Sequence, residues 1–348
     1  MKAYQFEDVE RGLKLVDVPV PILASDQVLL KVEAAGLCHS DVHIISGAFS
    51  NHLKKRPMTL GHEVAGVVVE VGSEVSNFAV GNRVVITSVL YPVEERSSLR
   101  NIGLDYDGGY APFAVADACR VVKIPDSVSY PQAAVATDAV ATAYHAVVVE
   151  AEAVASKTIG IVGLGGLGLN GVQIASLQGS KVYGIDIDAK KFAEAKRYGA
   201  ITCFTSLNEA SGIIFDSIVN FAGIGSTLRD AVNAVKLGGI VVSVGLGSKE
   251  LSFDTANLVL KNVHILKVLL LLVLRTLLPF FNLSLRVTSN LRWKRLGLIR
   301  LWKVWLVFIK ARSLDVFSQI LVRASTSYVY VKFLKHYSRR THIEFNPS

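Results

Sequence analysis

The feature that most constrains the fold of this chain is a glycine-rich turn between a predicted strand and a predicted helix. Residues 157–162, which end in Ile-Gly-Ile-Val, predict a buried strand, and residues 169–178 carry apolar side chains at helical spacing. The turn between them has glycine at its first, third and sixth positions, Gly163, Gly165 and Gly168. Asp186 follows 18 residues after the last glycine, directly after a second predicted strand. A glycine pattern alone is weak evidence, but the whole set is typical of a dinucleotide-binding βαβ unit.

The chemistry of a dinucleotide explains these residue types. Glycines let the backbone approach a pyrophosphate at the N-terminus of the helix, where free N–H groups and the helix dipole favour an anion. Asp186 can accept hydrogen bonds from both ribose hydroxyls and would repel a 2′-phosphate, which predicts NAD rather than NADP. Lys190 and Lys191 follow Asp186 closely in the sequence, and their positive charge could reduce the preference for NAD over NADP. Lys191 is also a candidate cofactor contact.

The rest of residues 1–267 divides into two patterns of secondary structure. After residue 156, strands alternate with helices, which predicts a doubly wound parallel sheet. Its further strands are expected at 201–204, 215–221, 240–244 and 263–267, with a helix at 227–237 that ends at Gly238-Gly239. Before residue 91, short β-branched runs broken by turn residues predict an all-β region with short connections. Examples are 28–34, 64–71 and 83–87.

A candidate metal site lies in the all-β region. Cys38 and His62 are 24 residues apart and are placed on different predicted loops. Thiolate, imidazole and carboxylate are zinc ligands, and a catalytic zinc needs three protein ligands with a fourth position open. On the pair alone, a small buried cysteine and a hydrogen-bonded core histidine remain the better interpretation, so the spacing leaves both alternatives open.

Three segments, residues 37–43, 61–72 and 80–84, resemble the zinc-dependent medium-chain alcohol dehydrogenases. The resemblance implies a GroES-like β-barrel catalytic domain over residues 1–150 and a Rossmann NAD-binding domain over 151–267. It also implies hydride transfer between a primary or secondary alcohol and NAD, with an aldehyde or ketone as product. Small-molecule alcohols, aldehydes or ketones are therefore the expected partners, and zinc and NAD the expected cofactors.

The same resemblance implies roles for individual residues. The implied zinc ligands are Cys38, His62 and Asp138. Asp138 stands where many members have cysteine and some secondary-alcohol dehydrogenases have Asp; its alternative is an acid at a helix start. Asp41 and Glu63 are implied to orient His62. Ser40 is implied to contact the zinc-bound oxygen, and His43 to form the outer end of a proton relay. His39 is implied to face the pyrophosphate, and Thr142 to support the nicotinamide ring. For Ser40 and His43 the alternative is loop polarity, and for Thr142 it is helix packing.

Cysteine usage limits the number of zinc ions and suggests a compartment. Members of the family commonly hold a structural zinc with four closely spaced cysteines between the positions of Thr87 and Gly108, and no cysteine occurs there. One zinc, the catalytic one, is therefore expected. The chain has only three cysteines and an acidic start without a signal-peptide pattern, which predicts a cytoplasmic protein.

Residues 268–348 differ in composition from everything before them. They contain 14 Lys and Arg against two acids, which leaves 23 basic and 27 acidic residues in 1–267. They also contain one glycine of the chain's 27. A membrane-associated tail and a nucleic-acid-binding arm are two interpretations of this leucine-rich, basic segment. We favour a shifted reading frame, because composition and family resemblance change together near Lys267. The expected partners then include neither nucleic acid nor a membrane, and the homo-oligomer implied by the family becomes doubtful.

Two other functions remain as alternatives to an active dehydrogenase. One is an inactive or membrane-associated remnant that keeps the folds without a closed cleft. The other is a zinc-free NAD(P)H quinone reductase of the same superfamily, which the joint presence of Cys38, His62 and Asp138 disfavours.

Overall fold

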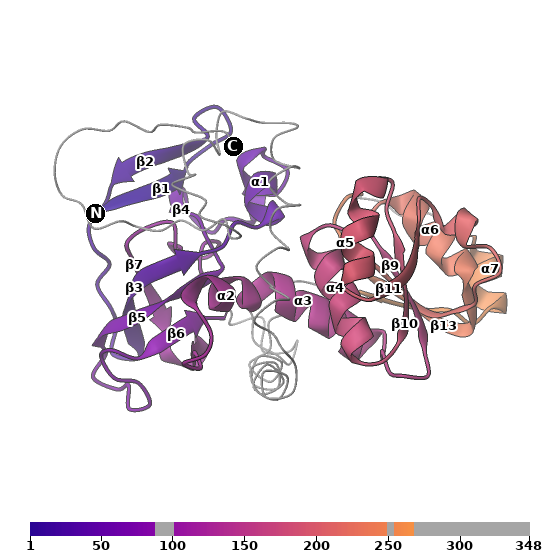
Figure 1. Ribbon diagram of the computed structural model, residues 1–348. Helices are drawn as coiled ribbons and strands as arrows, with labels where there is room; N and C mark the ends of the chain where they lie inside the picture. The colour runs from indigo at the N-terminus through magenta and orange to yellow at the C-terminus, as the bar shows by residue number, and fades with distance from the viewer. Residues whose placement is uncertain (88–100, 249–253, 268–348) are drawn as a thin grey trace. The chain divides into compact units, whose positions relative to one another are not determined.

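The computed structural model describes residues 1–87, 101–248 and 254–267 (Figure 1). The described residues form two compact units, which divide between Thr137 and Asp138. The cysteine-free segment 88–100 and the basic tail 268–348 lie outside the described residues, and the boundary expected after residue 150 stays a prediction. Within the described part of the chain, no helix combines the length and the apolar character that a membrane crossing requires.

The first unit contains two antiparallel sheets. A five-stranded sheet has the order β7-β3-β5-β6-β8, and a three-stranded sheet has the order β2-β1-β4. The elements are β1 (Lys2–Phe6), β2 (Leu13–Asp17), β3 (Gln27–Ala35), α1 (His39–Ile45), η1 (Ser50–His52), β4 (Met58–Thr59), β5 (Val64–Val71), β6 (Arg83–Ile86), β7 (Phe113–Asp117), η3 (Ala118–Arg120), β8 (Val121–Lys123) and α2 (Tyr130–Val135). The predicted strands at 28–34, 64–71 and 83–87 correspond to β3, β5 and β6.

The pairing of β3 with β5 explains why these runs are strands. Val28, Leu30 and Val32 alternate along β3 and are buried in one hydrophobic core. Gly66 of β5 lies directly against β3, because a Cβ added there would approach the carbonyl oxygen of Lys31 to 2.2 Å. The close approach of the two strands therefore requires glycine at this position.

The expectation of an all-β first region was wrong at residues 39–45, which form helix α1. Cys38 is its N-cap: the sulfur accepts a hydrogen bond from the backbone N–H of Ser40, and the Asp41 carboxylate accepts one from the N–H of Cys38. This is a capping box with a cysteine in place of the usual Ser, Thr, Asp or Asn. The usual signal of a helix start was therefore missing from the sequence.

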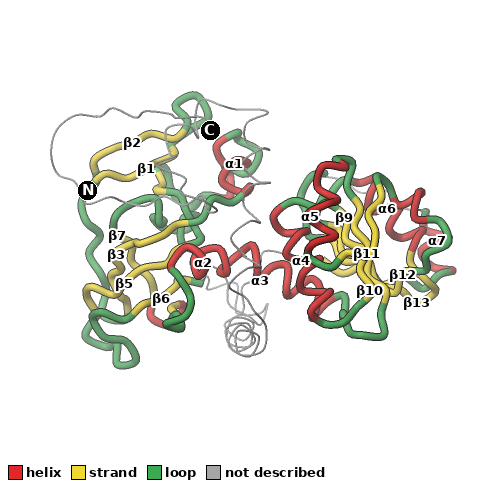
Figure 2. The backbone as a smooth tube through the Cα atoms, viewed as in Figure 1, coloured by secondary structure: helices red, strands yellow, loops and turns green. Residues whose placement is uncertain are grey.

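The second unit contains the predicted doubly wound parallel sheet (Figure 2). Its six strands have the order β11-β10-β9-β12-β13-β14, so the order reverses between β9 and β12, where such sheets bind ligands. The strands are β9 (Thr158–Val162), β10 (Lys181–Ile185), β11 (Ala200–Phe204), β12 (Phe215–Asn220), β13 (Val235–Ser243) and β14 (His264–Lys267). The helices are η4 (Ala136–Val140), α3 (Ala141–Tyr144), η5 (His145–Glu150), α4 (Gly166–Leu177), η6 (Ala189–Lys191), α5 (Phe192–Arg197), η7 (Leu207–Ala210), α6 (Gly225–Ala234) and α7 (Thr255–Leu260), and η4 begins just before the division between the units.

Two helix boundaries differ from the sequence-based expectation. The helix expected over 227–237 ends at Ala234, because Val235 adopts an extended conformation and pairs with Phe215 of β12. Sheet pairing therefore replaces the expected glycine C-cap, and Gly238, with φ of 67°, lies inside β13. Helix α4 begins at Gly166 rather than at residue 169, so the last glycine of the turn lies in the first helical turn.

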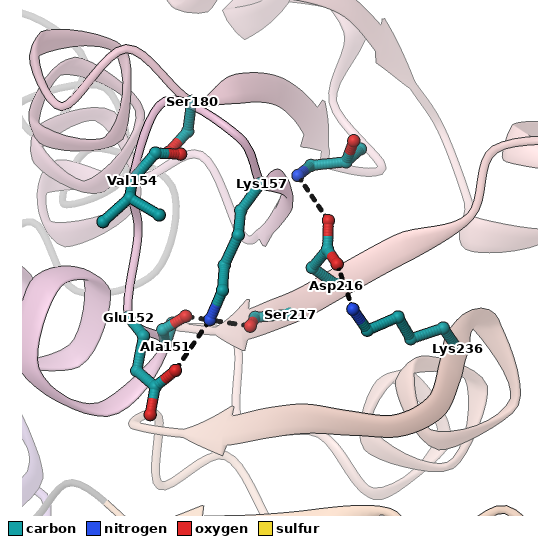
Figure 3. Close-up of polar contacts among 9 residues, drawn as sticks. Ala151, Glu152, Val154, Lys157, Ser180, Asp216, Ser217 and Lys236 are labelled. Atoms are coloured by element: carbon teal, nitrogen blue, oxygen red, sulfur yellow. Dashed lines mark hydrogen bonds and ion pairs between the residues drawn. The ribbon is translucent and has the colours of Figure 1, made fainter.

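Side-chain contacts hold the connector that enters the sheet at β9 (Figure 3). Ser217 donates a hydrogen bond to the carbonyl oxygen of Ala151 over 2.9 Å, and Lys157 pairs with Glu152 at 2.7 Å. Asp216 accepts a hydrogen bond from the backbone N–H of Thr158 over 2.8 Å and also pairs with Lys236. These contacts fix the start of β9, the strand whose other end carries the glycine turn.

Candidate metal centre and nucleotide site

The structure brings together one group of side chains that could hold a metal ion. Cys38, His62, Glu63 and Asp138 each offer a ligand atom, and these atoms all lie within 4.8 Å of one another. His62, Glu63 and Asp138 are 1%, 2% and 4% exposed, and Cys38 is half-buried. A sulfur, an imidazole nitrogen and carboxylate oxygens form a donor set that suits zinc. Residues 39–61 and the long interval before Asp138 separate these donors in the sequence, so folding assembles the set.

The carboxylate of Asp41 contacts two of these four residues, Cys38 and His62. One of its oxygens, Oδ2, accepts a hydrogen bond from the backbone N–H of Cys38 over 3.0 Å. The other, Oδ1, lies 3.4 Å from Nδ1 of His62. A carboxylate facing one ring nitrogen is the usual way in which a histidine is oriented so that its other nitrogen binds a metal. Asp41 thus lies next to His62, and its role in orienting His62 stays a prediction.

Tyr110 is a site residue that the sequence interpretation missed. Its hydroxyl donates to Oδ2 of Asp41 over 2.7 Å and lies 3.0 Å from the carbonyl oxygen of Gly36. The side chain is fully buried, and burial, followed by the charge of Asp41, raises the pKa of Tyr110 well above its usual value. Tyr110 therefore stays protonated and keeps donating to Asp41. The sequence signal was only its place in segment 105–111, which resembles the family without indicating a role.

Glu63 is itself a member of the group of potential ligands, although its implied role is to orient His62. Its carboxylate belongs to the same donor group as Cys38 and His62. Gly36 makes room for it, since a Cβ added at Gly36 would come within 1.8 Å of Oε2 of Glu63. The geometry therefore offers a fourth donor beside the three implied ligands, and the orienting role of Glu63 stays a prediction.

Asp138 lies inside a helical run and not at a helix start. The run begins at Tyr130, and Asp138 occupies η4, a turn of π-helix. Oδ1 of Asp138 accepts a hydrogen bond from the hydroxyl of Thr142, one turn later, over 2.8 Å. Nδ2 of Asn170 donates to the carbonyl oxygen of Ala139 over 3.3 Å, which satisfies a backbone group of the widened turn. The nicotinamide contact expected of Thr142 stays a prediction.

The residues expected to handle a proton lie on α1. The hydroxyl of Ser40 is 3.5 Å from the sulfur of Cys38. The rings of His39 and His43 are neighbours, with centroids 4.7 Å apart and an edge-to-face orientation. Desolvation, and then the nearby His43, lowers the pKa of His39, and desolvation lowers that of His43. Both rings are therefore neutral at pH 7, the form that can accept a proton.

The predicted nucleotide residues meet at the end of β9. Gly163 has φ of 86°, and a Cβ on Gly168 would lie 1.8 Å from the carbonyl oxygen of Gly163, so the turn depends on glycine at both positions. A Cβ on Gly165 would meet nothing within 4 Å, which leaves space beside the N-terminus of α4. Asp186, at the end of β10, accepts a hydrogen bond from the N–H of Leu164 over 2.7 Å.

Asp186 is also paired with the lysine that was expected to contact the cofactor. Nζ of Lys191 lies 2.8 Å from Oδ2 of Asp186, and both side chains are buried. Oδ1 of Asp186 accepts a hydrogen bond from the N–H of Asp188 over 2.8 Å. The carboxylate is therefore held in one orientation beside the glycine turn.

Models of two protein families match the chain. The alcohol dehydrogenase GroES-like domain matches residues 24–126, and the zinc-binding dehydrogenase domain matches residues 166–282. The second match extends 15 residues beyond Lys267, where the composition changes.

Similar proteins and structures carry dehydrogenase or reductase names. The NAD-dependent alcohol dehydrogenase of Sulfurisphaera tokodaii is 31% identical over 295 residues, which cover 76% of this chain and 84% of that protein. An alcohol dehydrogenase of Geobacillus stearothermophilus is 33% identical and covers 76% and 83% of the two chains. The structure of acetophenone reductase from Geotrichum candidum in complex with NAD aligns with a TM-score of 0.74 at 34% identity, over 83% of this chain and 87% of that one.

Proposed function

This chain belongs to the zinc-dependent medium-chain alcohol dehydrogenase family, and on that premise we propose that it transfers a hydride between a primary or secondary alcohol and NAD. The products are the aldehyde or ketone. The observation that carries the proposal is the donor group of Cys38, His62, Glu63 and Asp138 within 4.8 Å. Among the described residues, nothing favours an inactive remnant or a zinc-free quinone reductase.

The donor set fits zinc, and the residues that would hold it are Cys38, His62 and Asp138, with Glu63 as a further donor within reach. When bound, zinc supplies a Lewis acid that polarises the alcohol oxygen, and NAD supplies the hydride acceptor. The chain's own residues prepare this chemistry. Asp41 faces Nδ1 of His62 and also accepts a hydrogen bond from the N–H of Cys38. One carboxylate would therefore hold two of the proposed ligands in position relative to each other.

Proton transfer is assigned to the side chains of α1. We propose that Oγ of Ser40, which lies beside the sulfur of Cys38, holds the proton of the substrate hydroxyl. His43 is the proposed outer acceptor, because its lowered pKa keeps the ring neutral and able to take a proton at pH 7. His39 is the proposed pyrophosphate contact, and as a neutral ring it would act by hydrogen bonding rather than by charge.

Cofactor binding is assigned to the turn at the end of β9. Gly163, Gly165 and Gly168 would admit the pyrophosphate at the N-terminus of α4. Asp186 would accept hydrogen bonds from the ribose hydroxyls. Lys191, which pairs with Asp186, is the proposed second contact to the same ribose.

The proposed function is tested by assaying the purified chain. NADH formation, followed by absorbance, is measured with short primary and secondary alcohols and NAD. We expect turnover that stops when zinc is removed by a chelator and returns when zinc is added back. Turnover that is unaffected by zinc removal would contradict the proposal. The homo-oligomer, the cytoplasmic location, the lack of nucleic-acid or membrane partners and the shifted frame after Lys267 stay predictions.

Elemental analysis of the purified chain is expected to find about one zinc per molecule. Only one group of potential ligands occurs in the part of the chain that the structure describes, and Cys119 and Cys203 are not in it. No cysteine occurs in 88–100, so thiolates cannot bind a second ion there. A measured ratio of two would show that other residues form a structural site.

The Tyr110→Phe variant is expected to bind zinc about tenfold more weakly, at the low end of the range for residues that orient metal ligands. The change removes only the hydroxyl, which donates to Asp41, and Asp41 in turn faces His62. We also expect a loss of about 1–3 kcal/mol in the free energy of unfolding, because Asp41 loses a buried donor. Chelator competition and thermal unfolding measure the two effects. Unchanged zinc affinity would show that Tyr110 has only a packing role.

A further inference from the structure

We propose that the hydroxyl of Thr142 positions the metal ligand Asp138, and that this chain needs that hydroxyl because its third ligand is a carboxylate. The inference rests on the proposed zinc site. It gives Thr142 a role that is independent of any contact with the nicotinamide.

The contact is direct, buried and local. Oγ1 of Thr142 donates to Oδ1 of Asp138 over 2.8 Å, and the two residues are 2% and 4% exposed. They are four residues apart on one helical run, so the helix itself brings them together. A hydrogen bond to an ionised acceptor in a buried place is among the stronger ones that a protein makes.

The partner chosen by the hydroxyl is unusual for a threonine in a helix. Such hydroxyls commonly bond to a backbone carbonyl three or four residues earlier. Thr137, in the same helical run and also buried, does this and donates to the carbonyl oxygen of Ala134 over 2.6 Å. Thr142 instead donates to the side chain of Asp138. The two threonines therefore form a natural comparison, in which only the hydroxyl of Thr142 bonds to the side chain of a proposed ligand.

A carboxylate needs such a partner more than a thiolate does. The torsion that rotates the carboxylate of an aspartate has broad preferences, so the side chain alone does not fix the plane of its two oxygens. Thr142 is buried and its hydroxyl bonds to Oδ1 of Asp138, so the packing around Thr142 holds the donor in place. The bond to Oδ1 thereby fixes the plane of the Asp138 carboxylate. A cysteine at the same position would offer one ligand atom with no plane to set.

The turn that carries Asp138 is held as well. Asp138 lies in the π-helical turn η4, and Asn170 of α4 donates to the carbonyl oxygen of Ala139 over 3.3 Å. The backbone around the ligand is therefore anchored separately from the side chain. Removing the Thr142 hydroxyl should remove this hydrogen bond to the carboxylate and leave the backbone of the turn in place.

The test compares zinc affinity in the full chain, measured by competition with a chromophoric chelator in the absence of NAD and alcohol. Thr142→Val keeps the shape and removes the hydroxyl, and it is expected to weaken zinc binding by about 10–100-fold, the range for groups that orient metal ligands. Thr142→Ser keeps the hydroxyl and should bind zinc nearly as the parent does. Thr137→Val is the matched control and should also leave the affinity nearly unchanged. Equal affinities for Thr142→Val and the parent would overturn the inference.

The same substitution is also tested in a chain whose third proposed ligand is a cysteine. This comparison distinguishes a hydroxyl that positions the Asp138 carboxylate from one that only stabilises the helix. In the Asp138→Cys variant, Thr142→Val is expected to change zinc affinity much less than it does with aspartate present. An equal loss in both backgrounds would overturn the inference, because the hydroxyl would then support the helix and not the carboxylate. A parent chain that binds no zinc would instead contradict the proposed function. An effect seen without NAD cannot arise from a nicotinamide contact.

Discussion

The Cys38→Ser variant is expected to lose bound zinc and alcohol oxidation together. Mutation of a residue that only orients a metal ligand lowers metal affinity or activity by about 10–100-fold. Removal of a ligand itself should therefore lower kcat/KM by more than about 100-fold. Serine should preserve the local fold, because it is a good N-cap and Cys38 is the N-cap of α1. Elemental analysis and the NADH assay on the same preparation measure both losses.

Cys119→Ser is the control for this prediction. Cys119 is exposed in η3 and is not part of the donor group, so its replacement should leave zinc content and turnover unchanged. Circular dichroism of both variants checks that each remains folded. A folded Cys38→Ser chain that keeps zinc with the affinity of the parent would remove Cys38 from the ligand set.

The second large effect is expected at Asp186, where the cofactor preference should change. The parent chain should prefer NAD, because a carboxylate at the ribose repels a 2′-phosphate. Hydrogen bonds to charged groups contribute about 1.5–3 kcal/mol. Asp186→Ser should therefore lower the ratio of kcat/KM for NAD over NADP by about 10–100-fold. Lys191 strengthens the expectation, because it would lose its carboxylate partner and its positive charge would favour the phosphate of NADP.

The ratio of the two cofactors is the appropriate measurement, because Asp186→Ser should also reduce stability. The change leaves the buried Lys191 without the carboxylate that lies 2.8 Å away, and breaking such a pair costs several kcal/mol. A loss of folded protein affects both cofactors equally and cancels in the ratio. Asp188→Ser is the matched control, since the Asp188 side chain accepts a hydrogen bond from the N–H of Lys190 on the chain surface. Equal turnover of the parent with NAD and NADP would contradict the prediction.

Sequence patterns predicted the parallel sheet almost strand by strand. The second predicted strand, directly before Asp186, corresponds to β10, and the glycine turn lies between β9 and α4 as its spacing indicated. Patterns of this kind depend on residues within one strand or one turn, so they can be read from neighbours in the chain. Prediction from such local patterns was wrong where a contact with a distant residue set the end of a helix. Helix α6 ends before Val235, because Val235 pairs with Phe215 in the sheet.

The sequence by itself determined which residue types were available for the site, and only the tertiary structure decided how they meet. Cys38 and His62 were identifiable through family resemblance, and Asp186 through its place after a strand. The capping of α1 by Cys38, the hydroxyl of Tyr110 on Asp41 and the pairing of Lys191 with Asp186 were not. Even Thr142 and Asp138, four residues apart, left open whether the hydroxyl would bond to the backbone or to the carboxylate. Side-chain hydrogen bonds depend on torsions and burial that packing imposes, and a residue pattern contains neither.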